Sequence, residues 1–157
     1  MSPPVSVQLR PVHLDDLPTF YLQQLDVEAN RVAVANPRGP ESFAAHWAKV
    51  FPDPEVTVRA VVCDGVLAGQ IACFVADGAR SVGYWIGRDH WGKGVATQAL
   101  ALLLAEVAVR PIHARVATTN LGSIRVLERS GFRVVGHEMA EATERFPACE
   151  EALLVLG

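Results

Sequence analysis

Cysteine is scarce in this sequence, and the net charge is small. The three cysteines, Cys63, Cys73 and Cys149, show no metal-ligand spacing, and two of them lie within apolar, strand-like runs. This pattern argues against a disulfide framework or a metal site and predicts small, buried thiols in a reducing compartment. The formal net charge of −3 disfavours nucleic acid as a general partner, because a basic surface is what attracts phosphate backbones.

Membrane-spanning runs and targeting signals are also absent. The apolar run at residues 95–109 is too short to cross a bilayer, and residues 1–4 lack the charged and apolar regions of a signal peptide. We therefore expect a cytoplasmic protein that does not enter a membrane. Half of the 157 residues are hydrophobic, and no repeat or interdomain linker is evident, so residues 1–157 are expected to form a single domain.

The pattern of apolar residues predicts strands and helices in a mixed order. Asp64-Gly65 is a strong hairpin signal between two strand-like runs, Pro111 ends a long apolar helix, and Gly131 ends a shorter one. This order predicts an α+β fold with a mixed, largely antiparallel central sheet and flanking helices. Strands are expected at residues 5–10, 56–63, 66–76, 81–86, 113–118, 132–143 and 150–156, and helices at residues 14–29, 42–50, 94–108 and 121–130.

A glycine-rich turn lies in the segment Tyr-Trp-Ile-Gly-Arg-Asp-His-Trp-Gly-Lys-Gly-Val-Ala-Thr at residues 84–97, between a strand-like stretch and a helix. Such a turn exposes unpaired backbone N–H groups at the positive end of the helix dipole. The missing side chains at Gly92 and Gly94 would let a pyrophosphate approach the backbone closely. The segment therefore predicts a site for a phosphorylated cofactor.

Two common phosphate loops fit this segment poorly. The spacing from Gly87 resembles a nucleoside-triphosphate loop, but Gly94 stands where that loop needs a hydroxyl to bind magnesium. A dinucleotide loop needs a third glycine where Thr97 stands, and it closes the first strand-helix unit rather than lying in mid-chain. A turn that merely allows a sharp entry into a helix stays open as the structural alternative.

A second segment, Asn120-Leu-Gly-Ser-Ile-Arg-Val-Leu-Glu-Arg-Ser-Gly-Phe132, follows about 25 residues later. Together the two segments resemble the GNAT acyl-CoA-dependent N-acetyltransferases, and in particular the branch of ribosomal-protein alanine N-acetyltransferases. The resemblance covers most of the chain, and its diagnostic part runs from about Ser81 to Phe132. It implies the GNAT acyl-CoA N-acyltransferase fold and acetyl-CoA as cosubstrate, with no metal.

The resemblance also implies where acetyl-CoA binds. In the family, the strands on either side of the loop helix splay apart, and the cosubstrate lies between them. The backbone around Trp85 and Ile86 would hold the pantetheine arm and the thioester carbonyl. Trp91 departs from the Gln or Arg that the broad family prefers, which leaves pyrophosphate binding to backbone N–H groups, with added charge from one lysine. The residues of this loop are Gly92, Lys93, Gly94, Val95, Ala96 and Thr97.

Chemistry in the family is direct attack of an amine on the thioester. Asn120 is expected to cap a helix, to hold the pantetheine amides, or both. Ser123 stands where this branch carries a serine near the cofactor sulfur, so it is the candidate for hydrogen bonding to the departing thiolate. Many GNAT proteins have a tyrosine four residues later, but this sequence has Leu127 there, which excludes a tyrosine at that position.

The resemblance places the general base near Ala142, on the strand that follows the Gly-Phe pair. Side chains alternate along a strand, so Glu138 and Glu144 would share the face of that position, and Glu144 is the first choice. The structural alternative for Glu144 is a solvated carboxylate near a hairpin turn. His137 and Glu28 are further candidates.

Three functions therefore stand side by side. The favoured one is transfer of an acetyl group from acetyl-CoA to a primary amine on a protein N-terminus or a small molecule. A non-catalytic acyl-CoA sensor on the same fold and a nucleotide-binding regulator are the alternatives. Homodimer formation is left open, and residues 26–39 and 138–149, where substrate selectivity is expected, contain no transferable code for the amine.

Overall fold

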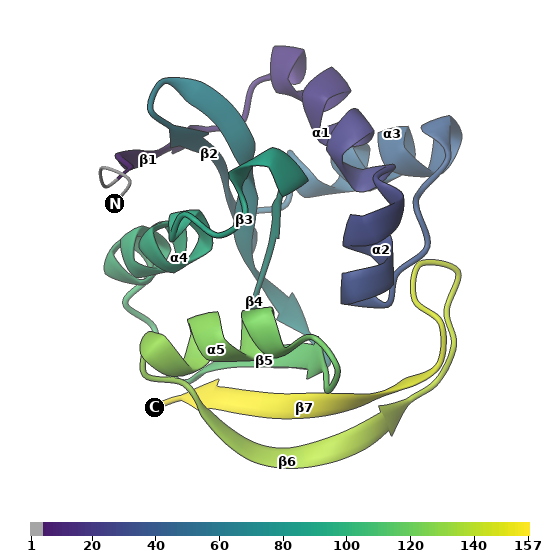
Figure 1. Ribbon diagram of the computed structural model, residues 1–157, viewed down its shortest axis with the longest axis vertical. Coiled ribbons are helices and arrows are strands. Elements are labelled where there is room, and N and C mark those ends of the chain that lie inside the picture. Colours follow the sequence, from purple (N-terminus) through teal and green to yellow (C-terminus); the bar gives the residue numbers. More distant parts are fainter. Residues whose placement is uncertain (1–4) are drawn as a thin grey trace.

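A seven-stranded sheet in the spatial order β1-β2-β3-β4-β5-β7-β6 carries helices on both faces (Figure 1). The computed structural model describes residues 5–157. Neighbouring strands are antiparallel except β4 and β5, which run parallel. The predicted α+β class with a mixed, largely antiparallel sheet is therefore confirmed. The strands are β1 (Val7–Pro11), β2 (Thr57–Cys63), β3 (Val66–Ala76), β4 (Ala79–Ile86), β5 (Ile112–Ala117), β6 (Arg133–Ala140) and β7 (Cys149–Leu156).

Two aspartate-glycine turns close the hairpins in the first half of the sheet. Asp64-Gly65 joins β2 to β3, and Asp77-Gly78 joins β3 to β4, with φ values of 50°, 82°, 51° and 75°. This left-handed backbone suits two-residue hairpin turns, and glycine and aspartate adopt it more readily than other residues. The first turn was predicted from the sequence, and the second makes β4 start at Ala79 rather than at residue 81.

One face of the sheet is covered by α4 (Val95–Glu106) and α5 (Leu121–Arg129) (Figure 1). The mainly apolar sequence of α4 places Leu100 and Leu103 in the larger hydrophobic core, against buried side chains of several strands. Both helices agree with the predictions at 94–108 and 121–130 apart from their end residues. They lie on either side of the place where β4 and β5 meet, which positions the site described below.

The opposite face is covered by α1 (Leu17–Gln24) and α3 (Pro40–Val50). Their aromatic side chains form a second, smaller core. The rings of Phe20 and Trp47 are stacked with centroids 5.6 Å apart, and Phe43 packs against Trp47 at 6.3 Å. Such aromatic contacts contribute both buried area and preferred geometry, so they fix these helices on the sheet.

The single helix predicted at residues 14–29 is wrong. The chain there forms a 3₁₀ turn (Leu14–Asp16), then α1, and then a separate helix α2 (Val27–Ala33). The break has a local cause, because the Asp26 side chain accepts a hydrogen bond from the backbone N–H of Ala29 at 2.9 Å and so caps a new helix. An aspartate that caps in this way competes with continuation of the preceding helix.

The strand predicted at 132–143 is too long, since β6 ends at Ala140. Residues 141–148 form a loop before β7, with its own hydrogen bonds. The backbone N–H of Phe146 donates to the Thr143 hydroxyl at 3.0 Å, and the Thr143 N–H donates to the Phe146 carbonyl at 2.7 Å. This local turn uses backbone groups that a longer ladder would need, so the alternation of side chains does not extend past Ala140.

The cysteine prediction is confirmed for two of its three residues. Cys63 and Cys73 are buried free thiols, and Cys149 is a half-buried one. None of the helices within residues 5–157 is long and apolar enough to cross a membrane.

Candidate active site

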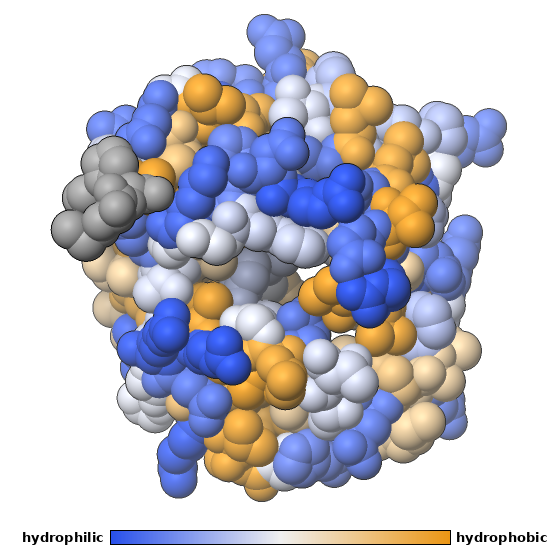
Figure 2. Space-filling model, in the orientation of Figure 1, coloured by the Kyte–Doolittle hydropathy of each residue, from blue (hydrophilic) through white to orange (hydrophobic). Residues whose placement is uncertain are grey.

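A cleft opens where β4 and β5 diverge. The two strands share a single parallel bridge, between Ser81 and His113, whereas β3 and β4 pair along the whole of β4. Beyond that bridge lies a cavity of about 480 Å³, and Figure 2 shows its mouth as a hollow near the middle of the face. Its walls come from α2, β4, the following turn, α4 and α5. They include Ala29, Val32, Ala33, Tyr84, Trp85, Ile86, His90, Trp91, Gly92, Gly94, Val95, Ala96, Thr97, Asn120, Gly122, Ser123, Arg125, Val126 and Arg129.

The backbone of β4 has a free edge toward this cleft. The N–H of Gly87 donates to the carbonyl of Ala68 at 2.8 Å, and a Cβ on Gly69 would lie 2.2 Å from the Trp85 carbonyl. Because backbone groups alternate between the two sides of a strand, Trp85 bonds toward β3, while Tyr84 and Ile86 turn their N–H and C=O groups toward the cleft. The cleft-facing backbone predicted at Trp85 and Ile86 is therefore shifted to Tyr84 and Ile86.

Trp91 uses one of these cleft-facing groups. Its indole N–H donates to the carbonyl of Ile86 at 2.8 Å. This bond ties the turn that follows β4 back onto the strand. Trp91 thus fixes the shape of the turn. This structural role explains why an uncharged tryptophan can stand at this position.

The glycine turn has the backbone conformation that the sequence suggested. Gly92 and Gly94 have φ values of 74° and 77°, and a Cβ on either would meet no atom within 4 Å. Their requirement is thus conformational, because side chains rarely adopt this backbone. The first bond of α4 runs from the N–H of Gln98 to the carbonyl of Gly94, at 3.1 Å. The N–H groups of Val95, Ala96 and Thr97 therefore have no partner within the helix.

Most of the predicted loop residues line the cleft. Gly92, Gly94, Val95, Ala96 and Thr97 are among its walls. Lys93 is not, since it lies exposed at the turn. The positive charge at the cleft comes instead from Arg125 and Arg129, one helical turn apart on α5. Neither arginine was predicted, although their i, i+4 spacing beside Ser123 was the signal that could have identified them.

Asn120 and Ser123 meet at the start of α5. The Asn120 side-chain oxygen accepts a hydrogen bond from the backbone N–H of Ser123 at 3.2 Å, so Asn120 caps the helix as one of its expected roles required. Both residues line the cleft. The cap fixes the first turn of α5 and thereby the position of the Ser123 hydroxyl.

A tyrosine does reach this hydroxyl, but from β4. The phenol oxygen of Tyr84 lies 2.7 Å from the Ser123 Oγ. Burial raises the pKa of Tyr84 above its ordinary value, and the hydrogen bond with Ser123 opposes that shift in part. Leu127, the position at which a tyrosine was excluded, is buried in the core. The sequence predicts Tyr84 only as part of a strand, although its alternation with Ile86 places it on the same side of that strand as Ile86.

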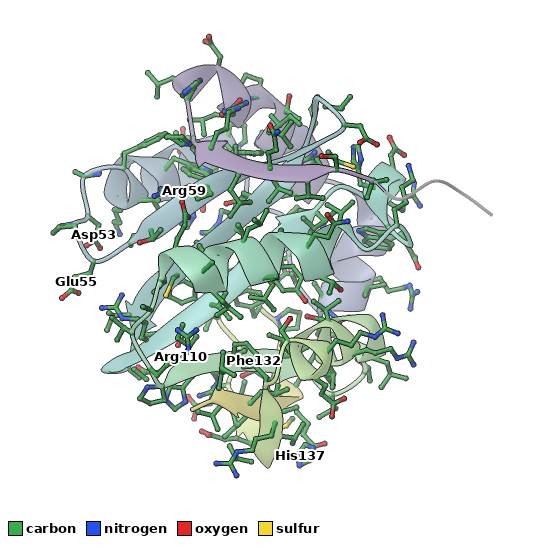
Figure 3. All side chains as sticks on the ribbon, turned by 90° about the vertical axis from the view of Figure 1, so that its left-hand side faces the viewer. Asp53, Glu55, Arg59, Arg110, Phe132 and His137 are labelled. Carbon is green, nitrogen blue, oxygen red and sulfur yellow. The ribbon has the colours of Figure 1, made fainter. Side chains whose placement is uncertain are left out.

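The carboxylates and the histidine proposed as bases lie outside the cleft. Glu144 is exposed in the loop between β6 and β7, and the argument that placed it on the face of position 142 fails because β6 ends earlier. Glu28 forms an ion pair with Arg31 on the surface of α2, and this pairing lowers the pKa of Glu28. His137 lies on β6 at the lower edge of the molecule in Figure 3.

The indole of Trp85 projects to the other side of the sheet from Tyr84 and Ile86, as alternation requires. Its N–H donates to the backbone carbonyl of Gln23 on α1 at 3.2 Å. The Arg145 guanidinium lies over the indole ring, 5.1 Å from its centroid. Trp85 therefore separates the cleft from the α1 and α3 side of the protein.

Comparison with known proteins places this geometry in a family. Residues 6–133 match the family model described as "Acetyltransferase (GNAT) domain". A curated protein of Bacillus subtilis (strain 168), "Probable N-acetyltransferase YjcK", is 37% identical over 81 residues, which make up 46% of this chain and 45% of that protein. The chain thus matches less than half the length of this relative.

Two solved structures share the fold. Mycobacterium smegmatis RimJ in complex with CoA-disulfide has a TM-score of 0.78 and 24% identity, covering 96% of this chain and 81% of that one. Spermidine N-acetyltransferase from Vibrio cholerae in complex with CoA and spermine has a TM-score of 0.81 and 17% identity, covering 96% and 94%. The fold expected from the resemblance is confirmed, and the match to the family model includes both diagnostic segments. The chain belongs to the GNAT acetyltransferase family.

Proposed function

We propose that the protein transfers an acetyl group from acetyl-CoA to a primary amine, which belongs to a protein N-terminus or to a small molecule. The observation that carries this proposal is the hydroxyl pair of Tyr84 and Ser123, 2.7 Å apart, in a cleft that also contains the glycine turn of α4. A phosphate-binding turn alone would serve many ligands. The hydroxyl pair adds a proton donor inside the same cleft.

The residues of the cleft fit acetyl-CoA along its length. Unpaired N–H groups at the start of α4 suit the pyrophosphate, because the positive end of the helix dipole favours anions. Arg125 and Arg129 add positive charge from α5. The free edge of β4 at Tyr84 and Ile86 suits the pantetheine amides, which would pair with it as a further strand does.

The reaction forms a C–N bond and breaks the C–S bond of the thioester. As the amine attacks, the N–H of Ile86 would donate to the carbonyl oxygen while negative charge develops there. The electron pair of the C–S bond then goes to sulfur. Ser123 would donate its proton toward the thiolate, and Tyr84 would donate to the Ser123 oxygen in turn, so the two hydroxyls form one chain of donors.

The attacking amine must also lose a proton. Among residues 5–157 no carboxylate lines the cleft, and His90 contributes an imidazole, the side chain that most often acts as a general base, to its wall. We therefore assign the proton to His90 or to water entering at the cleft mouth. Glu144, the first choice from the sequence, is not needed for this step.

Release of coenzyme A thiol in the presence of a panel of primary amines tests the proposal. Ser123→Ala should lower the rate, whereas Ser130→Ala is the matched control, because Ser130 does not line the cleft and its hydroxyl donates to the Val126 carbonyl at 3.1 Å. A non-catalytic acyl-CoA sensor needs the glycine turn but not the hydroxyl pair. Binding of acetyl-CoA without transfer to any amine would favour that sensor and overturn the proposal.

A further inference from the structure

A second, smaller cavity lies behind Trp85, on the α1 and α3 side of the sheet. It has a volume of about 80 Å³, and Trp85 forms part of its wall as well as part of the cleft wall. One water needs about 10–15 Å³ of such space. The cavity therefore has room for several waters or for one carboxylate or phosphate group, but not for a peptide or a nucleotide. Its other polar lining residues are Gln24, Arg38, His46, Trp47, Gln70 and Arg145.

Two half-buried arginines from different loops face this cavity. Arg38 precedes α3, and Arg145 lies in the loop between β6 and β7. Within residues 5–157 neither takes part in an ion pair. Arg145 donates to the carbonyl of Asn36 and lies over Trp85. The backbone of Arg38 is held at both ends by Gln24, through its N–H at 2.6 Å and its carbonyl at 3.0 Å.

The positive groups around the cavity disfavour one another. Burial, and after it the nearby charge of Arg38, lowers the pKa of Arg145 to about 10. Burial, followed by the charges of Arg38, Arg145 and Lys49, lowers the pKa of His46 to about 4. The carboxylate of Glu144 is exposed. Its charge raises the pKa of Arg38 and so partly opposes the effect of burial, which lowers that pKa. The cavity wall thus carries positive charge, and none of the described residues that line it is acidic.

A buried donor in the same wall also lacks a partner. The indole N–H of Trp47 is buried, with no hydrogen-bond acceptor among the described residues, and the residue is only 1% exposed. Buried polar groups normally have a partner, and a bound water or anion could supply the one that this indole N–H lacks. The wall of the cavity thus contains two arginines and a tryptophan whose indole N–H has no partner, and no acidic residue within residues 5–157 lines it.

We propose that this cavity binds the anionic group of the acceptor, so that the substrate is a primary amine that also carries a carboxylate or a phosphate. The proposal rests on the acetyl transfer proposed above and specifies its substrate class. A guanidinium stacked on an indole keeps its N–H edge free for paired hydrogen bonds to an oxyanion. Trp85 lines both the cleft and the cavity, so an acceptor whose amine lies in the cleft and whose anion lies in the cavity would have to extend past this side chain.

The same charges disfavour a polyamine. Spermidine and spermine carry only positive groups, so the two half-buried arginines oppose them, and no acidic residue within residues 5–157 lines the cavity to bind them. The Vibrio cholerae protein that contains spermine shares the fold with this chain at 17% identity, and its substrate does not carry over.

Binding of simple anions tests the cavity without any acetyl transfer. Inorganic phosphate and acetate are titrated into the protein in the absence of acetyl-CoA, with tryptophan fluorescence as the signal, because Trp47 and Trp85 line the cavity. Arg145→Gln and Arg38→Gln should each weaken binding about tenfold or more, as the loss of a charged hydrogen bond does. Arg133→Gln, an exposed arginine on β6, is the control for net charge. Equal binding in all four proteins would overturn the proposal.

A second measurement uses matched amines. An amino acid is compared with its amide, and a phosphorylated amine with its parent alcohol, through kcat/KM for acetyl transfer. The anion should raise kcat/KM about tenfold or more in the wild type and have little effect in Arg145→Gln. The pair that shows the effect identifies carboxylate or phosphate as the source. Equal kcat/KM for acid and amide, or a preference for spermidine, would overturn the anion site.

The two proposals can fail separately. Anion binding that is lost in both arginine variants, with no transfer to any amine, would keep the anion site and remove the acetyltransferase function. Acetyl transfer at the same kcat/KM with and without an anion on the acceptor would keep the acetyltransferase function and remove the anion site. Arg38→Gln keeps the test decisive if Arg145→Gln does not fold, since Arg38 lies outside the contacts that Arg145 makes with Asn36 and Trp85.

Discussion

The phenol oxygen of Tyr84 lies 2.7 Å from the hydroxyl oxygen of Ser123, across 39 positions of sequence. The contact joins β4 to the first turn of α5, and so it forms at the place where the sheet divides. Tyr84 has one proton to donate. If Ser123 donates its proton to the leaving sulfur, Tyr84 must be the donor in its hydrogen bond with Ser123. The proton chain then runs from Tyr84 to Ser123 to sulfur.

Replacement of Ser123 by alanine should lower kcat by about 10- to 1000-fold, because a transition-state donor is lost. The affinity for acetyl-CoA should stay nearly unchanged. Tyr84→Phe should lower kcat about 10-fold in the wild-type background and have little effect after Ser123→Ala, because its donation acts through the serine. Rates and dissociation constants of the two single variants and the double variant measure this. Full additivity of the two losses would show that Tyr84 and Ser123 act independently.

Replacement of Gly94 by valine should abolish binding of coenzyme A. A β-branched residue is strained at a φ of 77°, and its side chain would stand where the pyrophosphate approaches. Gly65→Val is the matched control for backbone strain, because Gly65 has a φ of 82° in a hairpin far from the cleft. Calorimetric titration should show binding lost in the first variant and kept in the second. Lys93→Ala should weaken binding only slightly, since Lys93 is exposed. Equal losses in the Gly94 and Lys93 variants would show that the turn does not hold the pyrophosphate.

The sequence was sufficient for the sheet and for the glycine turn before α4, because both depend on local signals. Asp64, Gly65, Gly92 and Gly94 have positive φ in short turns. The residues that make each turn are adjacent in the sequence, so the local sequence was enough to predict these turns. The prediction of one helix over residues 14–29 was wrong because a further local signal was missed. Asp15 and Asp16 marked a helix start, and the second cap at Asp26 was overlooked.

The contact of Tyr84 with Ser123 and the second cavity could not be predicted in this way. Tyr84 meets Ser123 only because β4 and β5 share one bridge and then diverge, which is a property of the assembled sheet. Arg38 and Arg145 come from loops more than 100 positions apart, joined by the hydrogen bond of Arg145 to Asn36 (|i−j| of 109). No spacing within a short segment reports such a meeting. Glu144 shows the converse. A local pattern predicted a strand through residue 143 and used its alternation to place Glu144 on one face, but β6 ends at Ala140.

Acid should destabilise the protein through His46. Its pKa is about 4 in the folded state, against an ordinary value of 6.5 in the unfolded chain. The unfolded chain therefore binds the proton more tightly, so this contribution to stability is complete above pH 6.5 and is lost as the pH falls from 6.5 toward 4. Chemical unfolding at several pH values should show a smaller loss over this window in His46→Asn. Saturating phosphate should raise the pKa of His46 and reduce the loss. An identical pH dependence in wild type and variant would contradict the assigned environment.

The last prediction concerns the proton of the amine and separates His90 from Glu144. His90 lines the cleft, whereas Glu144 is exposed in the loop between β6 and β7. If His90 accepts the proton, His90→Ala should lower kcat most near neutral pH and recover at high pH, where the amine loses its proton without help. Glu144→Gln should leave the pH profile of kcat unchanged, because Glu144 lies in the exposed loop after β6 and does not line the cleft. Its effect should fall instead on KM, since it removes the negative charge beside Arg38 and makes the cavity more positive toward an anionic acceptor. The profile of kcat against pH for the two variants decides between them: a low kcat near neutral pH that recovers at high pH in Glu144→Gln, with a normal profile in His90→Ala, would return the role of base to the glutamate.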